Sequence, residues 1–343
     1  MSHNATETLA PPANLSGSHS NNSCAVEDGF LTRVLPACYS VIFVLGLLGN
    51  AVATAVFFLR SRSHSSISVY MRHMAAADLL LVLCLPLRIY YHHRRGPFLV
   101  CRLVGTFFYV NMYASILFLS LISLDRYLKI MKPVWVFRVQ KVEWSRKVSY
   151  AVWALLVCGT LPFLLGGRPE GPCEEICFHF HRKSTSGAVI NLVTVALFYV
   201  LALGFLGSYG QISVKLWSIS LGNDEQARRK KRRVIVKTFV VPVIFTVCFM
   251  PYHAIRVPYV LAQLGVRSQE DMLSQVDAKQ TLHLLNELAL CLSALNSCLD
   301  PLIYFFLSST FRKTIICVVQ GKFKKMYAMN RRRSSVVKSV TEM

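Results

Sequence analysis

The chain has 343 residues, of which 54% are hydrophobic and only 16% are charged, and its formal net charge is +21. A soluble domain carries roughly a quarter charged residues, so this composition argues against a soluble protein. The positive charge would favour nucleic-acid binding in a soluble chain, but most Lys and Arg residues lie in alternate loops between apolar runs. That pattern is typical of membrane orientation, and we expect no nucleic-acid partner.

The N-terminal segment, residues 1–32, is polar and carries three sequons for N-glycosylation, at Asn4, Asn14 and Asn21. Such acceptors are surface sites on the extracellular side of a membrane. No basic stretch with an apolar core precedes the first long apolar run, so we expect the first span to direct insertion. The segment is therefore predicted to be an extracellular, glycosylated N-terminus.

Seven apolar runs follow, each long enough for a helix that crosses a bilayer. They are residues 33–59, 68–92, 98–130, 147–166, 187–217, 232–262 and 281–307. Basic residues follow the first, third and seventh runs and precede the sixth, which places all of them on one side of the membrane. The positive-inside rule then puts the N-terminus outside and the C-terminus inside. The sequence predicts an all-α membrane protein whose seven transmembrane helices form a domain of residues 33–307.

A short amphipathic segment, residues 308–320, follows the last span directly. It predicts an eighth helix that lies on the inner membrane surface, with Phe311, Ile315 and Ile316 facing lipid. Cys317 in this helix is a candidate for palmitoylation, and a free thiol fits the sequence nearly as well.

Residues 321–343 form a basic cytoplasmic tail in which three arginines precede Ser334 and Ser335. Serines next to basic residues are candidate kinase sites, and their phosphates would be read by an arrestin. A simple contact with anionic membrane lipid is the alternative for the same basic cluster.

Ionisable residues inside the apolar runs are few, and such residues are costly enough in a bilayer to suggest a function. They are Asp78, Arg88, Asp125, Arg126, His253, Arg256, Glu287 and Asp300. Arg88 lies ten residues from Asp78, and Glu287 thirteen residues from Asp300. The set therefore divides between the outer end, the middle and the inner end of the predicted bundle.

Several of these residues stand in motifs that resemble those of the rhodopsin-like (class A) G-protein-coupled receptors. The motifs are Gly49-Asn50, Asp78, Asp125-Arg126-Tyr127, Trp153, Phe249-Met250-Pro251-Tyr252 and Asp300-Pro301-Leu302-Ile303-Tyr304. They occur in the family's order over nearly the whole chain. The resemblance implies a multi-pass plasma-membrane receptor, not an enzyme. Its expected partners are a heterotrimeric G protein, arrestin, receptor kinases and the surrounding membrane lipid.

Finer features resemble the purinoceptor-like branch of that family, namely the Tyr252–Arg256 segment and the aspartate at Asp300. Within the branch the sequence is most similar to a lysophosphatidylserine receptor. The segments that carry this likeness are 40–44, 108–113, 177–179 and Asn286-Glu287. Nucleotide and other lysophospholipid receptors share much of the pattern, so those ligands remain the alternatives.

The resemblance and the residue chemistry together predict a ligand site at the outer end of the bundle. Its candidate residues are Arg88, Tyr109, Tyr113, His253, Arg256, Asn286 and Glu287. Guanidinium groups bind phosphate or carboxylate through paired hydrogen bonds, so two arginines favour an anionic ligand. A phosphoserine headgroup also has an ammonium that Glu287 suits. The alternative is that the arginines pair with Glu287 or with acids of the loops.

An acyl chain of the ligand would need an apolar slot near these residues. The candidates are Tyr109, Tyr113, Phe107, Phe163, Leu197, Phe198 and Tyr199. Aromatic residues at helical spacing more often form ordinary helix core, which is the alternative.

Hard oxygen ligands gather near the middle of the predicted bundle, where the family holds a sodium ion that favours the inactive state. The matching residues are Asp78, Ser115, Asn296, Ser297 and Asp300. Two carboxylates this close need a cation or a proton between them. A structural Na⁺ is therefore the only cofactor that we expect, and a hydrogen-bonded water cluster is the alternative.

The coupling and activation residues implied by the resemblance are Asp125, Arg126, Tyr127, Tyr209, Phe245, Phe249, Pro251 and Tyr304. Arg126 would be held beside Asp125 at rest and released toward Tyr209, Tyr304 and a G protein. Lys231 stands where many relatives place an acid, so no lock from the sixth span is expected. Phe245, Phe249 and a kink at Pro251 would form a switch that repacks.

Two disulfides are implied. Cys101 and Cys177 match the family's bridge between the third span and the second outer loop. Cys24 has no partner before the seventh span, as the branch would have, and the remaining outer candidate is Cys173. We therefore expect a second bridge between Cys24 and Cys173.

Two other classes of function remain as alternatives. A membrane-embedded hydrolase would need several inward His and Asp ligands, but only His253 is well placed. An ion or proton transporter is suggested by the buried aspartates, although no internal repeat is visible in the sequence.

Overall fold

The computed structural model describes residues 31–59, 65–92, 94–131, 141–166, 177–178, 184–218, 225–264 and 272–320. The helices in these ranges are α1 (Leu31–Leu59), α2 (Ser66–Tyr90), α3 (Phe98–Met131), α5 (Val142–Leu165), α6 (Thr185–Ser218), α7 (Glu225–Leu264), α8 (Met272–Ala294), α9 (Asn296–Leu307) and α10 (Ser309–Val319). The structure is thus all helical over the described part of the chain, as predicted.

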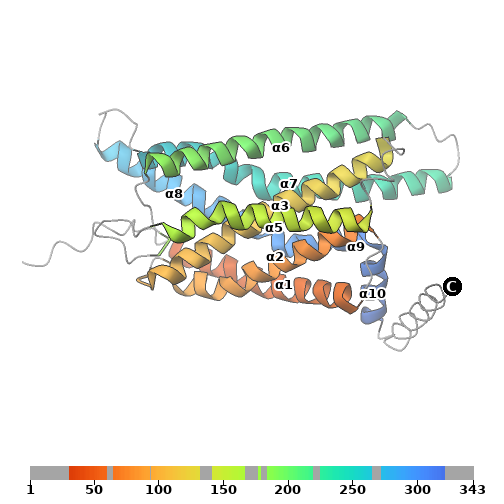
Figure 1. Cartoon of the computed structure of the whole chain (residues 1–343), viewed down its shortest axis with the longest axis horizontal. Helices are drawn as coiled ribbons and strands as arrows, with labels where there is room; N and C mark the ends of the chain where they lie inside the picture. Colours follow the sequence, from red (N-terminus) through yellow and green to blue (C-terminus); the bar gives the residue numbers. More distant parts are fainter. Residues whose placement is uncertain are drawn as a thin grey trace, which may run out of the picture.

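The long helices lie side by side along the long axis of the molecule, and α10 crosses one end of the bundle (Figure 1). Within the described residues, seven helical segments are long and apolar enough to span a membrane, which confirms the seven predicted spans. The orientation in the membrane stays a prediction from the charge pattern. We call the end that holds α10 the inner end and the opposite end the outer end.

Several helix boundaries differ from the expected ones by a few residues, and the largest differences are in the sixth and seventh spans. The sixth span begins within α7, which starts at Glu225 instead of residue 232, because Arg, Lys and Glu continue a helix beyond the apolar stretch. The seventh span consists of α8 and α9, which are interrupted at Leu295. This interruption lies directly beside Asn296 and Ser297, two candidate sodium ligands.

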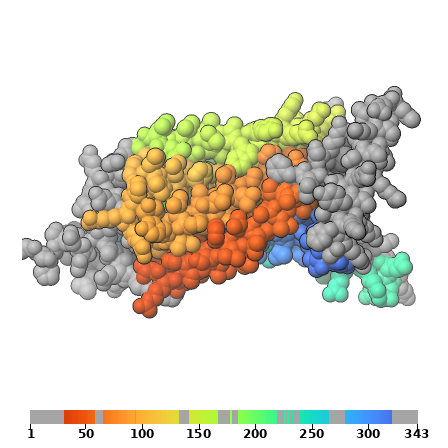
Figure 2. Space-filling model, turned by 90° about the horizontal axis from the view of Figure 1, so that it is seen from below, coloured from red at the N-terminus to blue at the C-terminus, as the bar shows by residue number. Residues whose placement is uncertain are grey.

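The bundle is ordered from a central helix to peripheral ones. In the apolar membrane-spanning stretch of α3, 56% of the residues are buried inside the bundle, whereas only 11% are buried in that of α5. Helices α1, α2 and α5 form one outer face of the bundle (Figure 2). Many large apolar side chains of α5 and α6 are exposed on the surface of the bundle, which suits contact with lipid tails.

The Gly49-Asn50 motif explains how closely α1 approaches α9. A Cβ atom added at Gly49 would lie 2.7 Å from Cγ of Pro301, so only glycine fits this contact. Asn50 donates through Nδ2 to the carbonyl oxygens of Ser297, at 2.7 Å, and Gly46, at 3.0 Å. The motif therefore fixes the first span against the polar middle of the seventh.

Helix α10 confirms the predicted eighth helix, but one of its expected lipid contacts is wrong. Phe311 is buried at 4% exposure, where it stacks on Phe57 and meets Tyr304 edge-on. Ile315 is partly buried against the core, whereas Ile316 is largely exposed. The aromatic ring gains more contacts against the bundle than against lipid, so it anchors α10 to α1 and α9.

Candidate functional site

Arg88 and Glu287 form a buried ion pair at the outer end. Arg88 Nη2 lies 2.6 Å from Glu287 Oε2, and the two side chains are only 3% and 6% exposed. The guanidinium carbon also lies over three aromatic rings, at 3.8 Å from the centroid of Phe178, 5.2 Å from Phe108 and 5.9 Å from Tyr39. Arg88 therefore pairs with Glu287 inside the protein, which was the alternative to ligand binding, and the carboxylate of Glu287 balances its charge.

Arg256 has a different environment. Its Nε and Nη2 atoms donate to Asn191 Oδ1 at 3.2 and 2.9 Å, and its Nη1 donates to Asn286 Oδ1 at 3.2 Å. The guanidinium lies 5.3 to 5.9 Å from the ring centroids of Tyr109, Tyr252 and Tyr259. The side chain is buried, yet among the described residues no carboxylate lies within ion-pair distance of it. Its charge is therefore stabilised by neutral groups.

His253 lies one turn deeper than Arg256 on α7. Its Nδ1 atom is 2.8 Å from the carbonyl oxygen of Phe249, and its ring stacks on Phe198 with the centroids 3.5 Å apart. Tyr113 meets the same ring edge-on at 5.9 Å. The structure thus brings His253 and Tyr113 together on the inner side of Arg256.

The predicted acyl-chain slot is only partly supported. Phe198 is buried between His253 and Phe245, but Leu197 is 64% exposed and Phe163 is 44% exposed. Neighbouring positions on a helix point about 100° apart, so Leu197 and Phe198 cannot face the interior together. Leu197 and Phe163 therefore lie on the outside of the bundle, and the acyl-chain slot stays a prediction. Phe107, Tyr109, Tyr113 and Tyr199 are partly buried.

Two side chains that contact the arginines of this region were not among the predicted site residues. Asn191 supplies two of the three hydrogen bonds to Arg256, and a polar residue early in the fifth span was the available signal. The ring of Phe178 lies over the guanidinium of Arg88. Its backbone φ is 61°, a value that residues other than glycine rarely adopt. The 177–179 segment was noted for its resemblance to the branch, but the contact of this ring with Arg88 was not predicted, because it depends on the fold of the outer loop.

In the middle of the bundle, all five candidate sodium ligands are buried. Asp78 accepts from Asn111 Nδ2 at 3.0 Å and from the Tyr304 hydroxyl at 3.4 Å. Asn296 Nδ2 donates to Asp300 Oδ2 at 2.8 Å. The structure therefore places the side chains of α2, α3 and α9 around one polar centre.

This polar centre fits a small cation. Among the described residues, buried oxygen atoms without a hydrogen-bond partner are found on Ser115, Asn296 and Asp300. Asp300 also lies close enough to Asp78 for the two carboxyl groups to interact, so they need a cation or a shared proton between them, and Ser297 lies beside Asp78. Unpaired oxygen donors around two negative charges are the ligand set that a hard cation such as Na⁺ prefers.

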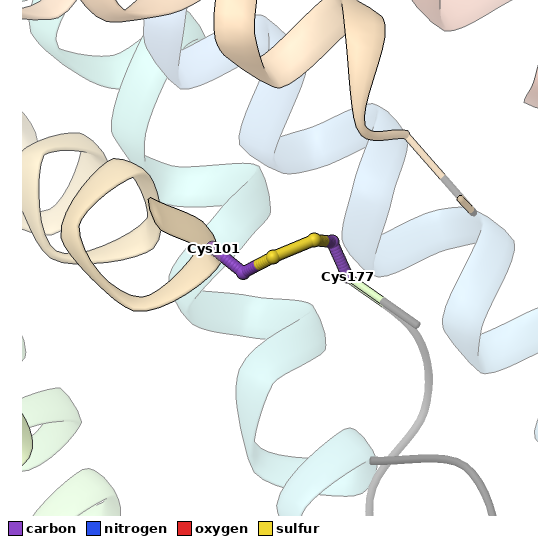
Figure 3. The surroundings of a disulfide bond; sticks show 2 residues. All are labelled: Cys101 and Cys177. Carbon is purple, nitrogen blue, oxygen red and sulfur yellow. A yellow bond between two sulfur atoms is a disulfide. The ribbon is translucent and has the colours of Figure 1, made fainter. Parts of the chain in front are cut away.

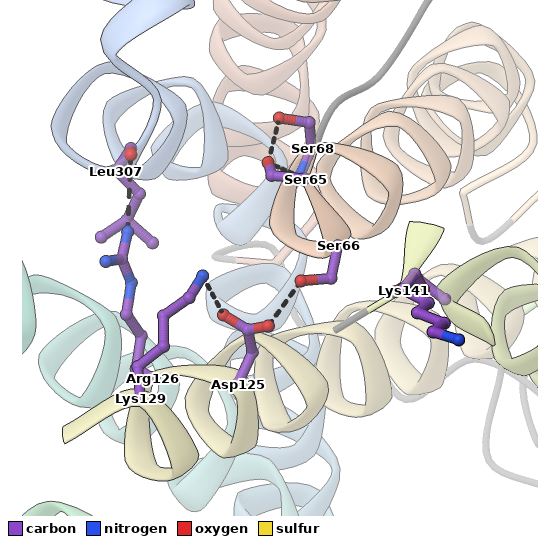
Figure 4. Close-up of polar contacts among 9 residues, drawn as sticks. Ser65, Ser66, Ser68, Asp125, Arg126, Lys129, Lys141 and Leu307 are labelled. Atoms are coloured by element: carbon purple, nitrogen blue, oxygen red, sulfur yellow. Dashed lines mark hydrogen bonds and ion pairs between the residues drawn. The ribbon is translucent and has the colours of Figure 1, made fainter. Parts of the chain in front are cut away.

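At the inner end, Asp125 and Arg126 have separate partners (Figure 4). Asp125 accepts from Ser66 Oγ at 2.5 Å and from Lys129 Nζ at 3.1 Å. Arg126 Nη2 donates to the carbonyl oxygen of Leu307 at 3.5 Å, at the end of α9. The expected contact with Asp125 is therefore not the one that holds Arg126 in this structure.

The other predicted coupling residues pack between the polar centre and the inner end of the bundle or beside it. Phe245 stacks on Phe205, with the ring centroids 4.2 Å apart, and meets Phe249 edge-on at 5.6 Å. Phe249 lies two residues before Pro251 inside α7. The Tyr127 hydroxyl donates to Gln211 at 2.8 Å. Tyr209 is buried, as is Tyr304. Lys231 lies in α7, and its side chain is outside the described part.

The disulfide between Cys101 and Cys177 is present, which confirms the prediction (Figure 3). It joins the start of α3 to the outer loop that carries Phe178. The predicted Cys24–Cys173 bridge and the sequons at Asn4, Asn14 and Asn21 lie outside the described residues, as does the tail of residues 321–343. Cys317 is a partly buried free thiol in α10, and its palmitoylation stays a prediction.

Comparison with known proteins gives one family match and several relatives. The family described as "7 transmembrane receptor (rhodopsin family)" matches residues 49–304. "Probable G-protein coupled receptor 34" of Pan troglodytes is 38% identical over 322 residues, which covers 92% of this chain and 83% of the relative. A purinoceptor of Bos taurus, numbered 14 in its series, is 32% identical over 90% of each chain. "Lysophosphatidic acid receptor 5" of Bos taurus is also 32% identical, over 89% of this chain and 84% of the relative.

Proposed function

Because the chain belongs to the rhodopsin family of G-protein-coupled receptors and resembles its purinoceptor-like members over most of their length, we propose that it is a plasma-membrane receptor for lysophosphatidylserine. The family is one of non-enzymatic receptors, so the chain is a receptor and not a hydrolase. The ligand enters at the outer end, and the inner end binds a heterotrimeric G protein.

Arg256 is the observation that carries the proposal. A buried guanidinium that has amide oxygens and ring faces as partners is a site of uncompensated positive charge. A phosphate group can replace water around such a charge through paired, charge-assisted hydrogen bonds. Arg256, with Asn286 and Tyr109 beside it, therefore binds the ligand's phosphate.

The Arg88–Glu287 pair suits the rest of a phosphoserine headgroup. The pair is neutral overall, so it neither attracts nor repels a ligand by net charge. A serine group is itself a zwitterion, and its carboxylate and ammonium match Arg88 and Glu287 respectively. This arrangement favours a ligand with an amino acid headgroup over one that ends in a bare phosphate.

A different ligand of the same branch is the second candidate. One relative is named as a purinoceptor and another as a lysophosphatidic acid receptor, and both cover most of this chain. Either a nucleotide or lysophosphatidic acid would satisfy Arg256, but neither carries the ammonium that Glu287 can bind. The ion pair therefore favours lysophosphatidylserine.

A panel assay of G-protein dissociation tests the proposal. Cells that express the receptor are exposed to lysophosphatidylserine, lysophosphatidic acid, lysophosphatidylcholine and a set of nucleotides, with untransfected cells as the control. Lysophosphatidylserine is expected to be the most potent by at least about tenfold, since about 1.4 kcal/mol of headgroup contact is worth that ratio. A nucleotide as the most potent agonist, or ion flux without G-protein activation, would refute the assignment.

Ligand binding is proposed to shift a pre-existing equilibrium toward a state that accepts the G protein. Phe198 stacks on both His253 and Phe245, and Phe245 meets Phe249 edge-on, so a change at the ligand site reaches these rings through packed side chains. Pro251 gives α7 a point at which it can bend. Arg126, whose hydrogen bond is to a backbone carbonyl, is then released to contact the G protein.

We expect sodium to oppose activation through the polar centre. In wild-type receptor, replacing sodium by an impermeant organic cation should raise agonist potency, because the ion stabilises the resting packing of Asp78 and Asp300. Asp300→Asn should remove most of this sodium dependence, since it removes one charge of the pair. The measurement is agonist potency at matched ionic strength, and equal sodium dependence in both receptors would contradict the site.

A further inference from the structure

His253 carries a buried polar atom that has no partner. Its Nδ1 faces the carbonyl oxygen of Phe249, and a carbonyl only accepts, so Nδ1 holds the proton. The other ring nitrogen, Nε2, is buried and has no hydrogen-bond partner in the part of the chain that the structure describes. A second proton on the ring would place a cation among aromatic rings one turn from Arg256, so the ring is neutral. Nε2 is therefore a bare acceptor.

The described groups around this atom do not supply a donor. Phe198 stacks on one face of the imidazole, at 3.5 Å between centroids. Tyr113 and Tyr252 meet it edge-on, at 5.9 and 5.2 Å, and neither hydroxyl is hydrogen-bonded to it. A lone pair in such a place repels phosphate and carboxylate oxygens. His253 therefore does not share the anion-binding role of Arg256, with which the sequence had grouped it.

We propose that Nε2 of His253 accepts a hydrogen bond from the free glycerol hydroxyl of the ligand, which makes the site selective for lysophospholipids over diacyl lipids. The inference rests on the proposed function and assigns a further group of the same ligand. His253 precedes Arg256 by three residues, a rise of about 4.5 Å along α7. In a lysophospholipid with its acyl chain on the terminal carbon, the hydroxyl is on the carbon next to the one that bears the phosphate. One ligand can thus reach both side chains.

A second acyl chain would turn that hydroxyl into an ester. The ester has no proton to donate, so Nε2 would stay unpaired in a dry environment, and this penalty is the physical basis of the selectivity. The same argument predicts that an analogue without the hydroxyl binds less well, although it is smaller than the natural ligand.

The test compares lysophosphatidylserine with its deoxy analogue, which has hydrogen in place of the glycerol hydroxyl. On wild-type receptor the analogue should be about five- to tenfold less potent, the usual value of a buried neutral hydrogen bond. On His253→Phe, which keeps the stacked ring but has no acceptor, the two lipids should be equally potent. On His253→Gln, whose amide oxygen lies near the position of Nε2, the difference should remain.

The outcomes separate this inference from the proposed function. Equal potency of the two lipids on wild-type receptor would mean that only water meets Nε2, and it would overturn the inference while the receptor assignment stood. A difference that persists in His253→Phe would also overturn it, because the hydroxyl would then bind elsewhere. No response of wild-type receptor to either lipid would overturn both. Surface expression is measured throughout, and His253→Asn replaces the Phe variant if that one does not reach the membrane.

Discussion

Replacement of Arg256 by alanine is expected to lower the potency of lysophosphatidylserine by at least about 30-fold while the receptor still reaches the cell surface. Loss of one partner from a buried, charge-assisted contact costs about 2–5 kcal/mol, and each 1.4 kcal/mol is tenfold. Folding is spared because Asn191 and Asn286, the groups left behind, are neutral amides. The measurement is a concentration–response curve with surface expression determined in parallel.

Arg102→Ala is the matched control for this experiment. Arg102 is also an arginine near the outer end, but it donates to the carbonyl oxygens of Leu164 and Gly166 at the end of α5. Its removal changes the net charge by the same amount without touching the proposed phosphate site. Similar losses of potency in both variants would mean that general charge attraction is responsible, and this result would contradict a specific contact at Arg256.

Replacement of Arg88 by alanine is expected to have a different effect, namely loss of folded receptor. Glu287 would keep its charge at 6% side-chain exposure without a partner, and breaking a buried pair in this way costs about 3–5 kcal/mol. The expected result is a large fall in surface expression and in the thermal midpoint of the purified receptor. Arg256→Ala should leave both quantities close to those of wild type.

A double variant separates stability from ligand binding at this pair. Replacing both Arg88 and Glu287 by leucine removes both charges together, and apolar side chains often substitute for a buried ion pair with little loss of stability. Surface expression should recover, whereas the preference for a serine headgroup over a bare phosphate should disappear. A double variant that folds and retains this preference would show that the ion pair does not read the headgroup.

The sequence predicted the features that depend on local pattern. Apolar length and loop charge gave the seven spans and the eighth helix, and the Gly49-Asn50 motif has its physical reason in the contact with Pro301. The contacts that a side chain makes with other helices of the bundle could not be predicted from local pattern. Arg88 and Arg256 have the same chemistry, and only the fold decides that one meets Glu287 and the other meets Asn191.

The sequence also did not determine the rotation of each helix about its axis, that is, which of its faces points to lipid and which to the other helices. An apolar side chain in a span can face lipid or protein, and the membrane weakens the usual contrast between a polar and an apolar face. This is why Phe311 was expected to face lipid although it is buried, and why the sequence did not separate the exposed Leu197 from the buried Phe198. Sequence reasoning found the charged residues of the site, together with Asn286 and Tyr109, but missed Asn191 and the ring of Phe178, which also contact the two arginines.

The proposed ligand site depends on Arg256, whose buried positive charge would bind the ligand's phosphate. Equilibrium binding to purified receptor in lipid nanodiscs tests this most directly, with lysophosphatidylserine and an analogue whose phosphodiester is replaced by a neutral linker. On wild-type receptor the charged lipid should bind at least about 30-fold more tightly, and on Arg256→Ala this preference should vanish. An undiminished preference for the phosphate in Arg256→Ala would contradict the account.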